Sequence, residues 1–227
     1  MLRATLNSAA VCLALLFGAG VAFGSDLKQQ IDPLARAMVD DGAVVGMVVG
    51  VIRDGSTHTF AYGEATRGAG ESPTPDTVYE IGSISKTFTG VLLADAALRG
   101  TVALDDPLSK HVPAGVTVPT ADDQPITLAH MATHTSGLPR MPDNMPRANP
   151  GDPYADYTAD LMYAFLSGHK LRRAPGVYEY SNYASGLLGQ ILATRADMTY
   201  EQLMLTRIAE PLKMNDTRTA LNESMRK

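Results

Sequence analysis

The stretch Glu80–Gly90 reads Glu-Ile-Gly-Ser-Ile-Ser-Lys-Thr-Phe-Thr-Gly and places Ser83 and Lys86 three residues apart at the start of a predicted helix. The helix is indicated by apolar residues at close to helical spacing, namely Phe88, Val91, Leu92 and Leu98. Gly100 is a typical C-terminal stop. Residues three apart on a helix are neighbours, so the lysine amine can reach the serine hydroxyl, and the helix N-terminus favours developing negative charge. Ser83 is therefore the candidate nucleophile for acyl transfer.

The serine-to-lysine spacing occurs three more times, at Ser25 and Lys28, Ser167 and Lys170, and Ser224 and Lys227. Spacing alone therefore does not identify the nucleophile. Ser25 lies at a predicted processing site, and Ser224 is close to the chain end, where chains are usually poorly ordered. Ser167 precedes Gly168, which is typical of a helix end. Only Ser83 opens a helix with a buried-looking pattern.

Residues 1–24 are predicted to be a signal peptide, because one basic residue precedes an apolar run that ends in Ala22-Phe23-Gly24. Cleavage is expected after Gly24. The alternative, an uncleaved anchor, is disfavoured because the run is shorter than the roughly 20 residues that a membrane-spanning helix needs. A periplasmic or secreted bacterial protein without a stable membrane span is expected. The only cysteine, Cys12, lies in this segment, so the processed chain would have no disulfide and no thiol nucleophile.

The composition is that of a globular domain, with 45% hydrophobic residues, 19% charged residues and a net charge of −5. The mildly acidic balance and the lack of basic runs argue against a nucleic-acid partner. Nothing in the sequence indicates an oligomeric state. We expect one domain over residues 25–227, with a sheet and the nucleophile helix over about 26–100 and a helical region over about 101–200.

A short helix is expected from Asp26 towards Met38. It is followed by a continuous Val, Met and Gly run over Gly42–Ile52 that predicts a buried strand. Asp54-Gly55 is a turn signal, and Thr57–Gly63 is a second predicted strand. Together these segments predict a β-hairpin that delivers the chain, through a loop, to the nucleophile helix.

The middle of the chain is predicted to be helical. Thr127 is expected to cap a short helix, and a capping box of Thr199 and Gln202 introduces the last one. The predicted helices cover residues 103–111, 128–134, 159–166, 183–195 and 200–209. Asn144–Pro153 is rich in Pro, Asn and Gly and is expected to be an irregular loop.

Tyr180-Ser181-Asn182 lies just before a predicted helix, so the tyrosine and asparagine can point into one cleft. A phenol can shuttle a proton, and an amide can hold both a substrate carbonyl and a lysine ammonium. The tripeptide alone is weak evidence. Together with Ser83 and Lys86 it forms a plausible catalytic set.

His130 and His134 are four residues apart, a spacing that suits a metal ion, but Met131 stands where the zinc-protease pattern needs a glutamate. No third ligand is evident, so neither a metal nor another cofactor is predicted, and His134 is interpreted as a hydrogen-bonded structural residue. The remaining histidines, His58, His111 and His169, are predicted to lie on the surface. The G-x-S-x-G elbow of α/β-hydrolases is absent.

With these residues in place, the chain resembles the class C β-lactamase and penicillin-binding-protein-like serine hydrolases. Ser83 and Lys86 match the first family motif, and Tyr180-Ser181-Asn182 matches the second. Further similar segments are Leu104–Leu108, Ile126–Leu128, Thr133–Pro139 and Pro211–Thr217. The stretch Leu104–Arg140 most resembles the periplasmic D-alanyl-D-alanine carboxypeptidase/endopeptidase branch. The resemblance implies an α/β (α+β) β-lactamase-like fold, with an antiparallel sheet flanked by helices and a mainly helical subdomain.

The resemblance also implies a mechanism in which Ser83 forms an acyl-enzyme with a D-alanyl peptide of peptidoglycan or with a β-lactam. Lys86 would take the serine proton, and Tyr180 would protonate the leaving nitrogen and activate the water; which of the two is the acylation base stays open. Asn182 would orient Lys86 and the substrate amide. By analogy with the loop that flanks the family's cleft, Arg140 and Met141 are candidate contacts to the substrate side chain, with a surface role as the alternative.

The family's third motif lies on a strand beyond the position where this sequence ends, Lys227. We therefore expect the C-terminal strands of the sheet to be missing, together with one of two oxyanion donors. Loss of such a donor costs about 100- to 1000-fold in rate. The hairpin would keep an open edge. Three alternatives to a carboxypeptidase/endopeptidase remain: a class C-type β-lactamase, a promiscuous esterase, or a truncated, non-catalytic penicillin-binding remnant.

Overall fold

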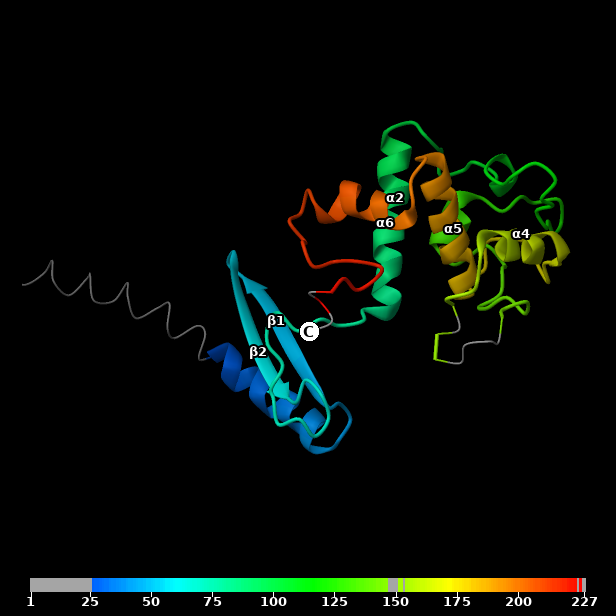
Figure 1. Cartoon of the computed structure of the whole chain (residues 1–227). Helices are drawn as coiled ribbons and strands as arrows, with labels where there is room; N and C mark the ends of the chain where they lie inside the picture. Colours follow the sequence, from blue (N-terminus) through cyan, green and yellow to red (C-terminus); the bar gives the residue numbers. More distant parts are fainter. Residues whose placement is uncertain (1–25, 147–150, 153, 224, 226–227) are drawn as a thin grey trace, which may run out of the picture. The chain divides into compact units, whose positions relative to one another are not determined.

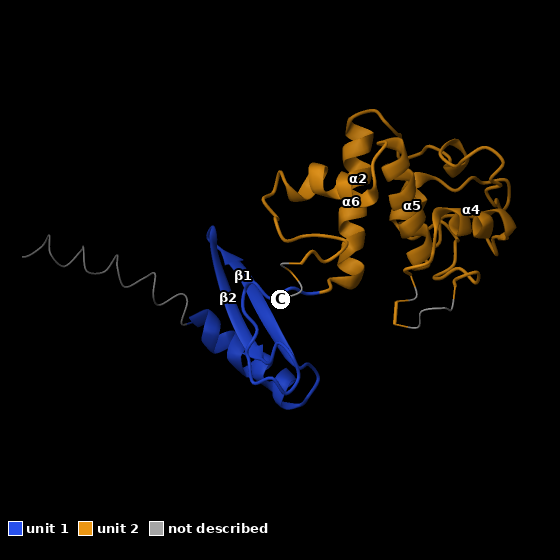
Figure 2. Cartoon of the chain, viewed as in Figure 1, with its two compact units in different colours: residues 1–79 blue, residues 80–227 orange. Residues whose placement is uncertain are grey.

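The computed structural model describes residues 26–146, 151–152, 154–223 and 225, so the predicted signal peptide lies outside the described residues. The chain divides into two compact units, one up to Tyr79 and one from Glu80 onward (Figure 2). The hairpin belongs to the first unit, and all the helices that carry candidate site residues belong to the second (Figure 1). Together the units give the predicted mixture of helices and an antiparallel sheet.

The first unit contains a helix over residues 26–40 and the predicted hairpin of β1 (Gly46–Arg53) and β2 (Ser56–Gly63). The strands are antiparallel, and their register pairs Arg53 with Ser56, which leaves Asp54 and Gly55 as a two-residue turn. Both turn residues have positive φ, 52° and 76°, as a type I′ turn requires. The turn predicted at Asp54-Gly55 is therefore confirmed.

The prediction that the first strand is buried is wrong. The residues of β1 are half-buried or exposed, and Ile52 is 78% exposed. The reason is that the described residues form a sheet of only two strands. The preceding helix packs against this hairpin, since the Tyr62 hydroxyl donates to Asp32 Oδ1 at 2.8 Å and Tyr62 is buried.

The second unit consists mainly of helices, in the order that the sequence predicts. The single turn η1 (Gly82–Ile84) leads into α2 (Ser85–Leu98), and η2 (Leu108–Lys110) is a 3-10 turn where a longer helix was expected. The helices that follow are α3 (Leu128–Ala132), α4 (Ala159–Gly168), α5 (Asn182–Arg195) and α6 (Tyr200–Met204), with a π-helical turn η3 (Leu205–Ala209) after α6. This agreement confirms the helical middle of the chain.

Helix α5 forms the centre of this unit. It contacts α2, α3 and α6, and nine of its residues are buried, which is typical of a helix that packs on most sides. The core around it is apolar and includes Leu92, Met131, Leu187 and Ile191. Because the residues just before α2 and α5 carry Ser83 and Tyr180, the packing of these two helices determines the position of both side chains.

Two helix starts are closed by capping boxes. Thr127 accepts a hydrogen bond from the backbone of His130, and the His130 Nδ1 accepts one from the Thr127 N–H. Thr199 and Gln202 form the box that was predicted for α6. His130 therefore has a structural role at the start of α3.

The prediction of a surface position for His111 is wrong. Its side chain is 1% exposed, and its Nε2 lies 3.0 Å from Asp106 Oδ2. Asp106 also accepts hydrogen bonds from the Ala103 N–H at 2.8 Å and from Lys110 at 2.6 Å. The Ala103 N–H, then Lys110 and His111, hold the pKa of Asp106 well below its ordinary value. The buried pair thus holds together residues 103–111 in the segment between α2 and α3.

Asp106 should make the stability of the fold sensitive to acid. Its pKa is lower in the folded chain than in the unfolded chain, so its contribution is present above the unfolded value of 3.8 and is lost as the pH falls below it. Asp106→Asn is expected to lower the free energy of unfolding at pH 7 and to flatten its dependence on pH below about 4. Urea unfolding followed by circular dichroism between pH 3 and 7 measures both effects. An unchanged pH dependence would contradict this role.

Candidate active site

Ser83 lies in the η1 turn immediately before α2, and Lys86 lies one turn further along. The Lys86 Nζ donates to Ser83 Oγ at 3.2 Å, so the predicted reach of the amine to the hydroxyl is confirmed. Gly82 precedes the serine with φ of +53°, a conformation that L side chains rarely adopt. The turn thus presents an exposed hydroxyl at the start of a helix.

Tyr180 is the second residue whose side chain contacts Ser83, because its hydroxyl lies 2.6 Å from Ser83 Oγ. Lys86 Nζ is 4.9 Å from the centroid of the tyrosine ring, and the Arg140 guanidinium is 5.1 Å from it. Hydrogen bonding from Lys86 and then from Ser83 lowers the pKa of Tyr180, and the positive charges of Lys86 and Arg140 add to this effect. The phenol is therefore easier to ionise than an ordinary tyrosine.

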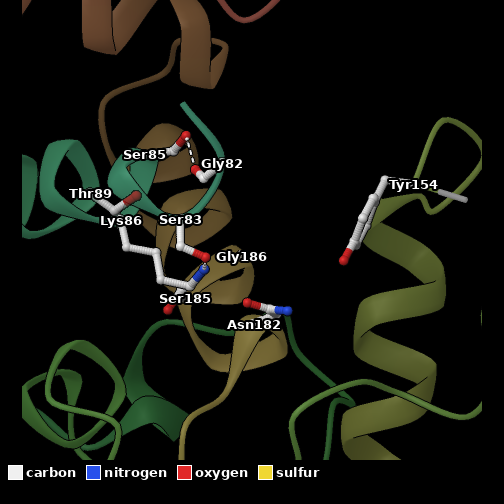
Figure 3. A pocket seen from close by; sticks show the side chains of 9 residues that line it. All are labelled: Gly82, Ser83, Ser85, Lys86, Thr89, Tyr154, Asn182, Ser185 and Gly186. Atoms are coloured by element: carbon white, nitrogen blue, oxygen red, sulfur yellow. Dashed lines mark hydrogen bonds between the residues drawn. The ribbon is translucent and has the colours of Figure 1, made fainter. Parts of the chain in front are cut away.

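Asn182 is the first residue of α5 and points into a cleft of about 390 Å³ in front of Ser83 (Figure 3). In Figure 3 the Lys86 amine lies beside the Ser83 hydroxyl, and the Asn182 amide lies on the same side of the cleft. The residues that line the cleft are Gly82, Ser83, Ser85, Lys86, Thr89, Tyr154, Asn182, Ser185 and Gly186. The structure thus brings together Ser83, Lys86, Tyr180 and Asn182 from two distant parts of the chain.

Arg140 and Met141 lie beside this cleft and do not line it. The Arg140 carbonyl accepts from the Asn182 N–H at 3.0 Å, and its guanidinium contacts the ring of Tyr180. The Met141 Sδ accepts from Asn182 Nδ2 at 3.5 Å. Contact of either residue with a substrate therefore stays a prediction, while their contacts with Tyr180 and Asn182 are observed.

Thr89, Ser185 and Tyr154 line the cleft although the sequence did not indicate them, and Tyr154 has the largest side chain of the three. It faces Ser83 from across the cleft, and its hydroxyl donates to Met141 Sδ at 3.6 Å (Figure 3). It directly follows Asn144–Pro153, the segment predicted as an irregular loop, part of which is outside the described residues. No periodicity or motif marks it, so no local sequence signal could have identified it.

In the described residues, the other serines and lysines with this spacing have different partners from Ser83 and Lys86. Ser167 lies in the last turn of α4, as predicted, and its Oγ accepts from the Thr117 N–H at 3.2 Å. Lys28 pairs with Asp32 at 2.6 Å. Ser25, Ser224 and Lys227 lie outside the described residues.

Ser181 connects the tripeptide to the preceding loop. Its side chain is fully buried, its Oγ donates to the Pro139 carbonyl at 2.6 Å, and the same oxygen accepts from the Ala184 N–H at 2.9 Å as the cap of α5. The Ser181 N–H donates to His134 Nδ1 at 3.2 Å, which confirms His134 as a hydrogen-bonded residue. One buried hydroxyl therefore fixes both the helix start and the loop.

Ser181→Ala is expected to lower the free energy of unfolding by about 1–3 kcal/mol, because it removes a helix cap and leaves the half-buried Pro139 carbonyl without its donor. Urea denaturation measures the loss. Ser56→Ala is the matched control, because Ser56 is exposed at the start of β2. Equal stability of the Ser181 and Ser56 variants would contradict the assigned role.

The residues that the structure describes contain neither a metal site nor a membrane-spanning helix. There, no group of three or more His, Cys, Asp or Glu residues is arranged to hold a metal ion. Within the same residues, no helix is long and apolar enough to cross a membrane.

Comparisons with known proteins agree with this geometry. The sequence profile of the family described as Beta-lactamase matches residues 31–227. The D-alanyl-D-alanine-carboxypeptidase/endopeptidase AmpH of Escherichia coli K12 is 38% identical over 226 residues, which cover 96% of this chain and 57% of that protein. A β-lactamase of the same organism is 34% identical over 83% of this chain and 48% of its own length.

Solved structures give the same result. The β-lactamase/D-alanine carboxypeptidase of Yersinia pestis, complexed with citrate, aligns with a TM-score of 0.80 at 34% identity, over 88% of this chain and 57% of that one. A class C β-lactamase in complex with cefoxitin aligns with a TM-score of 0.75 at 28% identity, over 89% and 54% of the two chains. The chain thus spans about half of the length of the relatives it matches.

Proposed function

The chain belongs to the β-lactamase family, and on this premise we propose that it is a serine hydrolase in which Ser83 forms an acyl-enzyme with D-alanyl-D-alanine peptides of peptidoglycan or with β-lactams. The observation that carries the proposal is the pair of contacts on one hydroxyl: Tyr180 at 2.6 Å and Lys86 at 3.2 Å from Ser83 Oγ. A serine hydroxyl is a weak nucleophile until a neighbouring group takes its proton. Here two such groups are within hydrogen-bond distance of it.

In the proposed reaction Ser83 Oγ attacks the carbonyl carbon, and its proton passes to the Tyr180 phenolate. We assign this step to Tyr180 rather than to Lys86, because the phenol is nearer and its pKa is lowered. Tyr180 then gives the proton to the leaving nitrogen as the C–N bond breaks, which leaves an ester on Ser83. A water molecule attacks that ester, again with its proton going to Tyr180, and Tyr180 returns this proton to Ser83 Oγ as the ester C–O bond breaks and the acid product leaves.

The neighbouring residues have supporting roles in this proposal. The Lys86 ammonium stabilises the phenolate, since it lies 4.9 Å from the ring centroid. The backbone N–H of Ser83, in the η1 turn just before α2, is the proposed donor to the developing oxyanion. Asn182, which lines the cleft and is held by Met141, would bind the substrate amide.

The proposed substrate class rests on the named activities of the relatives that this chain resembles. The carboxypeptidase/endopeptidase reading is favoured by 38% identity over 96% of this chain, whereas the β-lactamase reading is favoured by the 34% identical relative and by the cefoxitin complex among the structural neighbours. Because the chain spans only about half of these proteins, the activity and the substrate both belong to the proposal. A periplasmic or secreted location is proposed with them, from the signal-peptide pattern of residues 1–24.

One comparison of rates tests the substrate. The purified chain is incubated in parallel with a chromogenic cephalosporin, with a peptide that ends in D-alanyl-D-alanine and with a small ester, and the hydrolysis of each is measured, for the peptide as D-alanine release. The expected result is D-alanine release at a higher turnover than cephalosporin hydrolysis. Faster cephalosporin turnover assigns a β-lactamase instead, and hydrolysis of a small ester alone assigns an esterase.

A further inference from the structure

His134 packs directly against the ring of Tyr180. The ring centroids are 4.5 Å apart, with an angle of 36° between the ring planes. Tyr178 contacts the imidazole edge-on, with centroids 6.0 Å apart and an angle of 86°. His134 is half-buried and does not line the cleft. It therefore lies one layer behind Ser83, in contact with the side chain that touches the nucleophile.

His134 also holds the backbone on both sides of Tyr180. Its Nδ1 accepts from the Ser181 N–H at 3.2 Å, and its carbonyl accepts from the Glu179 N–H at 2.7 Å. An Nδ1 that accepts a hydrogen bond carries no proton, so the neutral ring has its proton on Nε2. His134 thus contacts residues 179–181 in three ways: its ring packs on Tyr180, its Nδ1 binds the Ser181 N–H, and its carbonyl binds the Glu179 N–H.

The surroundings of the imidazole favour its neutral form. Lys86 from α2 and Arg140 from the following loop lie against the same tyrosine ring, and the Glu179 carboxylate is bound by Arg173 at 2.6 Å. Burial, and then the positive charge of Lys86, lower the pKa of His134 below its usual 6.5. A protonated ring would lose its acceptor for Ser181 and would place a third positive charge beside Tyr180.

We propose that His134 is a positioning residue for Tyr180: its neutral ring supports the phenol against Ser83 and Lys86, and its Nδ1 fixes the Ser181 N–H. The kinetic consequence of this inference rests on the proposed function, whereas the positioning itself can be measured without any substrate. His134 itself touches neither the nucleophile nor the cleft.

The backbone conformation of His134 offers a clean set of variants. Its φ is +58°, a region that glycine adopts freely and asparagine tolerates. His134→Gly removes both the ring and the acceptor. His134→Asn restores an acceptor near the position of Nδ1 without the ring, and His134→Phe restores the ring without the acceptor. His169→Asn is the matched control, because His169 also stacks on an aromatic ring, that of Phe165 at 5.1 Å, and also has a pKa lowered by burial.

The substrate-free test follows the titration of Tyr180 by NMR in chains labelled with ¹³C at the tyrosine Cζ, with the signal assigned from Tyr180→Phe. The contacts of the phenol with Lys86 and Ser83 lower its pKa, so releasing the ring should raise that pKa towards its usual value of 10.0. We expect the rise in His134→Gly, smaller rises in the Asn and Phe variants, and no change in His169→Asn. Near-ultraviolet circular dichroism checks folding, and His134→Asn carries the test if the glycine variant does not fold.

The kinetic test measures acylation of Ser83 by a fluorescent penicillin. His134→Gly is expected to slow the acylation step about 100-fold, as a misplaced catalytic group does, with little change in the non-covalent binding of the penicillin. Below pH 6.5 the wild-type acylation rate should fall more steeply than protonation of Tyr180 alone requires, because the imidazole is protonated as well, and this additional steepness should be absent from His134→Asn. An unchanged Tyr180 titration or an unchanged acylation rate in a folded variant overturns the positioning role. Failure of the wild-type chain to acylate refutes the proposed function instead, and the titration still decides the role of His134.

Discussion

Ser83→Ala is expected to abolish covalent capture of penicillin. In the described residues, no other serine has a hydroxyl within hydrogen-bond distance of both a phenol and a lysine amine. Loss of the oxygen removes the bond that the acyl-enzyme needs, so the expected effect is complete loss rather than a reduced rate. The measurement is intact-protein mass spectrometry after incubation with penicillin, compared with the unsubstituted chain.

Ser167→Ala is the matched control for this variant. Ser167 has the same spacing to a lysine, Lys170, but lies at the end of α4, where its Oγ accepts from a backbone N–H. The control should be acylated like the unsubstituted chain. If Ser83→Ala still formed the adduct, or if Ser167→Ala lost it, the nucleophile would be assigned wrongly.

Tyr180→Phe is expected to slow acylation about 100- to 10,000-fold, the usual contribution of a positioned general base. Because the pKa of Tyr180 is lowered, the acylation rate of the unsubstituted chain should rise with pH and level off below the 10.0 of an ordinary phenol, as the base loses its proton. The phenylalanine variant should lack this rise. The measurement is the acylation rate between pH 5 and 10 for both chains.

The pH profile also separates the two candidate bases. A rise that persists unchanged in Tyr180→Phe would contradict the assignment of Tyr180 and would leave Lys86 as the proton acceptor. Tyr178→Phe is the control, because Tyr178 contacts His134 edge-on and is 66% exposed. Its profile should match that of the unsubstituted chain.

Local patterns in the sequence predicted most of the elements that carry the site. The apolar spacing after Ile84 predicts α2, and the Thr199–Gln202 capping box predicts the start of α6, because both depend on residues a few positions apart. The reach of Lys86 to Ser83 follows from one turn of helix and was confirmed at 3.2 Å.

The features that the sequence did not predict depend on residues far apart or on irregular backbone. The apolar run of β1 suggested burial, but burial depends on how many strands and helices cover it, which no local pattern states. His111 seemed isolated because its partner, Asp106, meets it through the 3-10 turn η2 where a longer helix was expected. Tyr154 reaches the cleft from a loop without periodicity.

The site itself was predictable as a set of residues but not as an arrangement. Ser83 and Tyr180 are 97 positions apart, and only the packing of α5 against α2 brings their hydroxyls to 2.6 Å. The loop that ends at Arg140 acts on the site through backbone groups, such as the Arg140 carbonyl that binds the Asn182 N–H. Side-chain chemistry read from the sequence gives no indication of such a contact.

The most direct test of the central claim is to incubate the folded chain with a labelled penicillin, digest it and locate the label by mass spectrometry. The account predicts a single adduct, carried by Ser83, whose mass is that of the intact penicillin because the β-lactam ring opens without losing atoms. No adduct on a chain shown to be folded, or an adduct on any other residue, would contradict it.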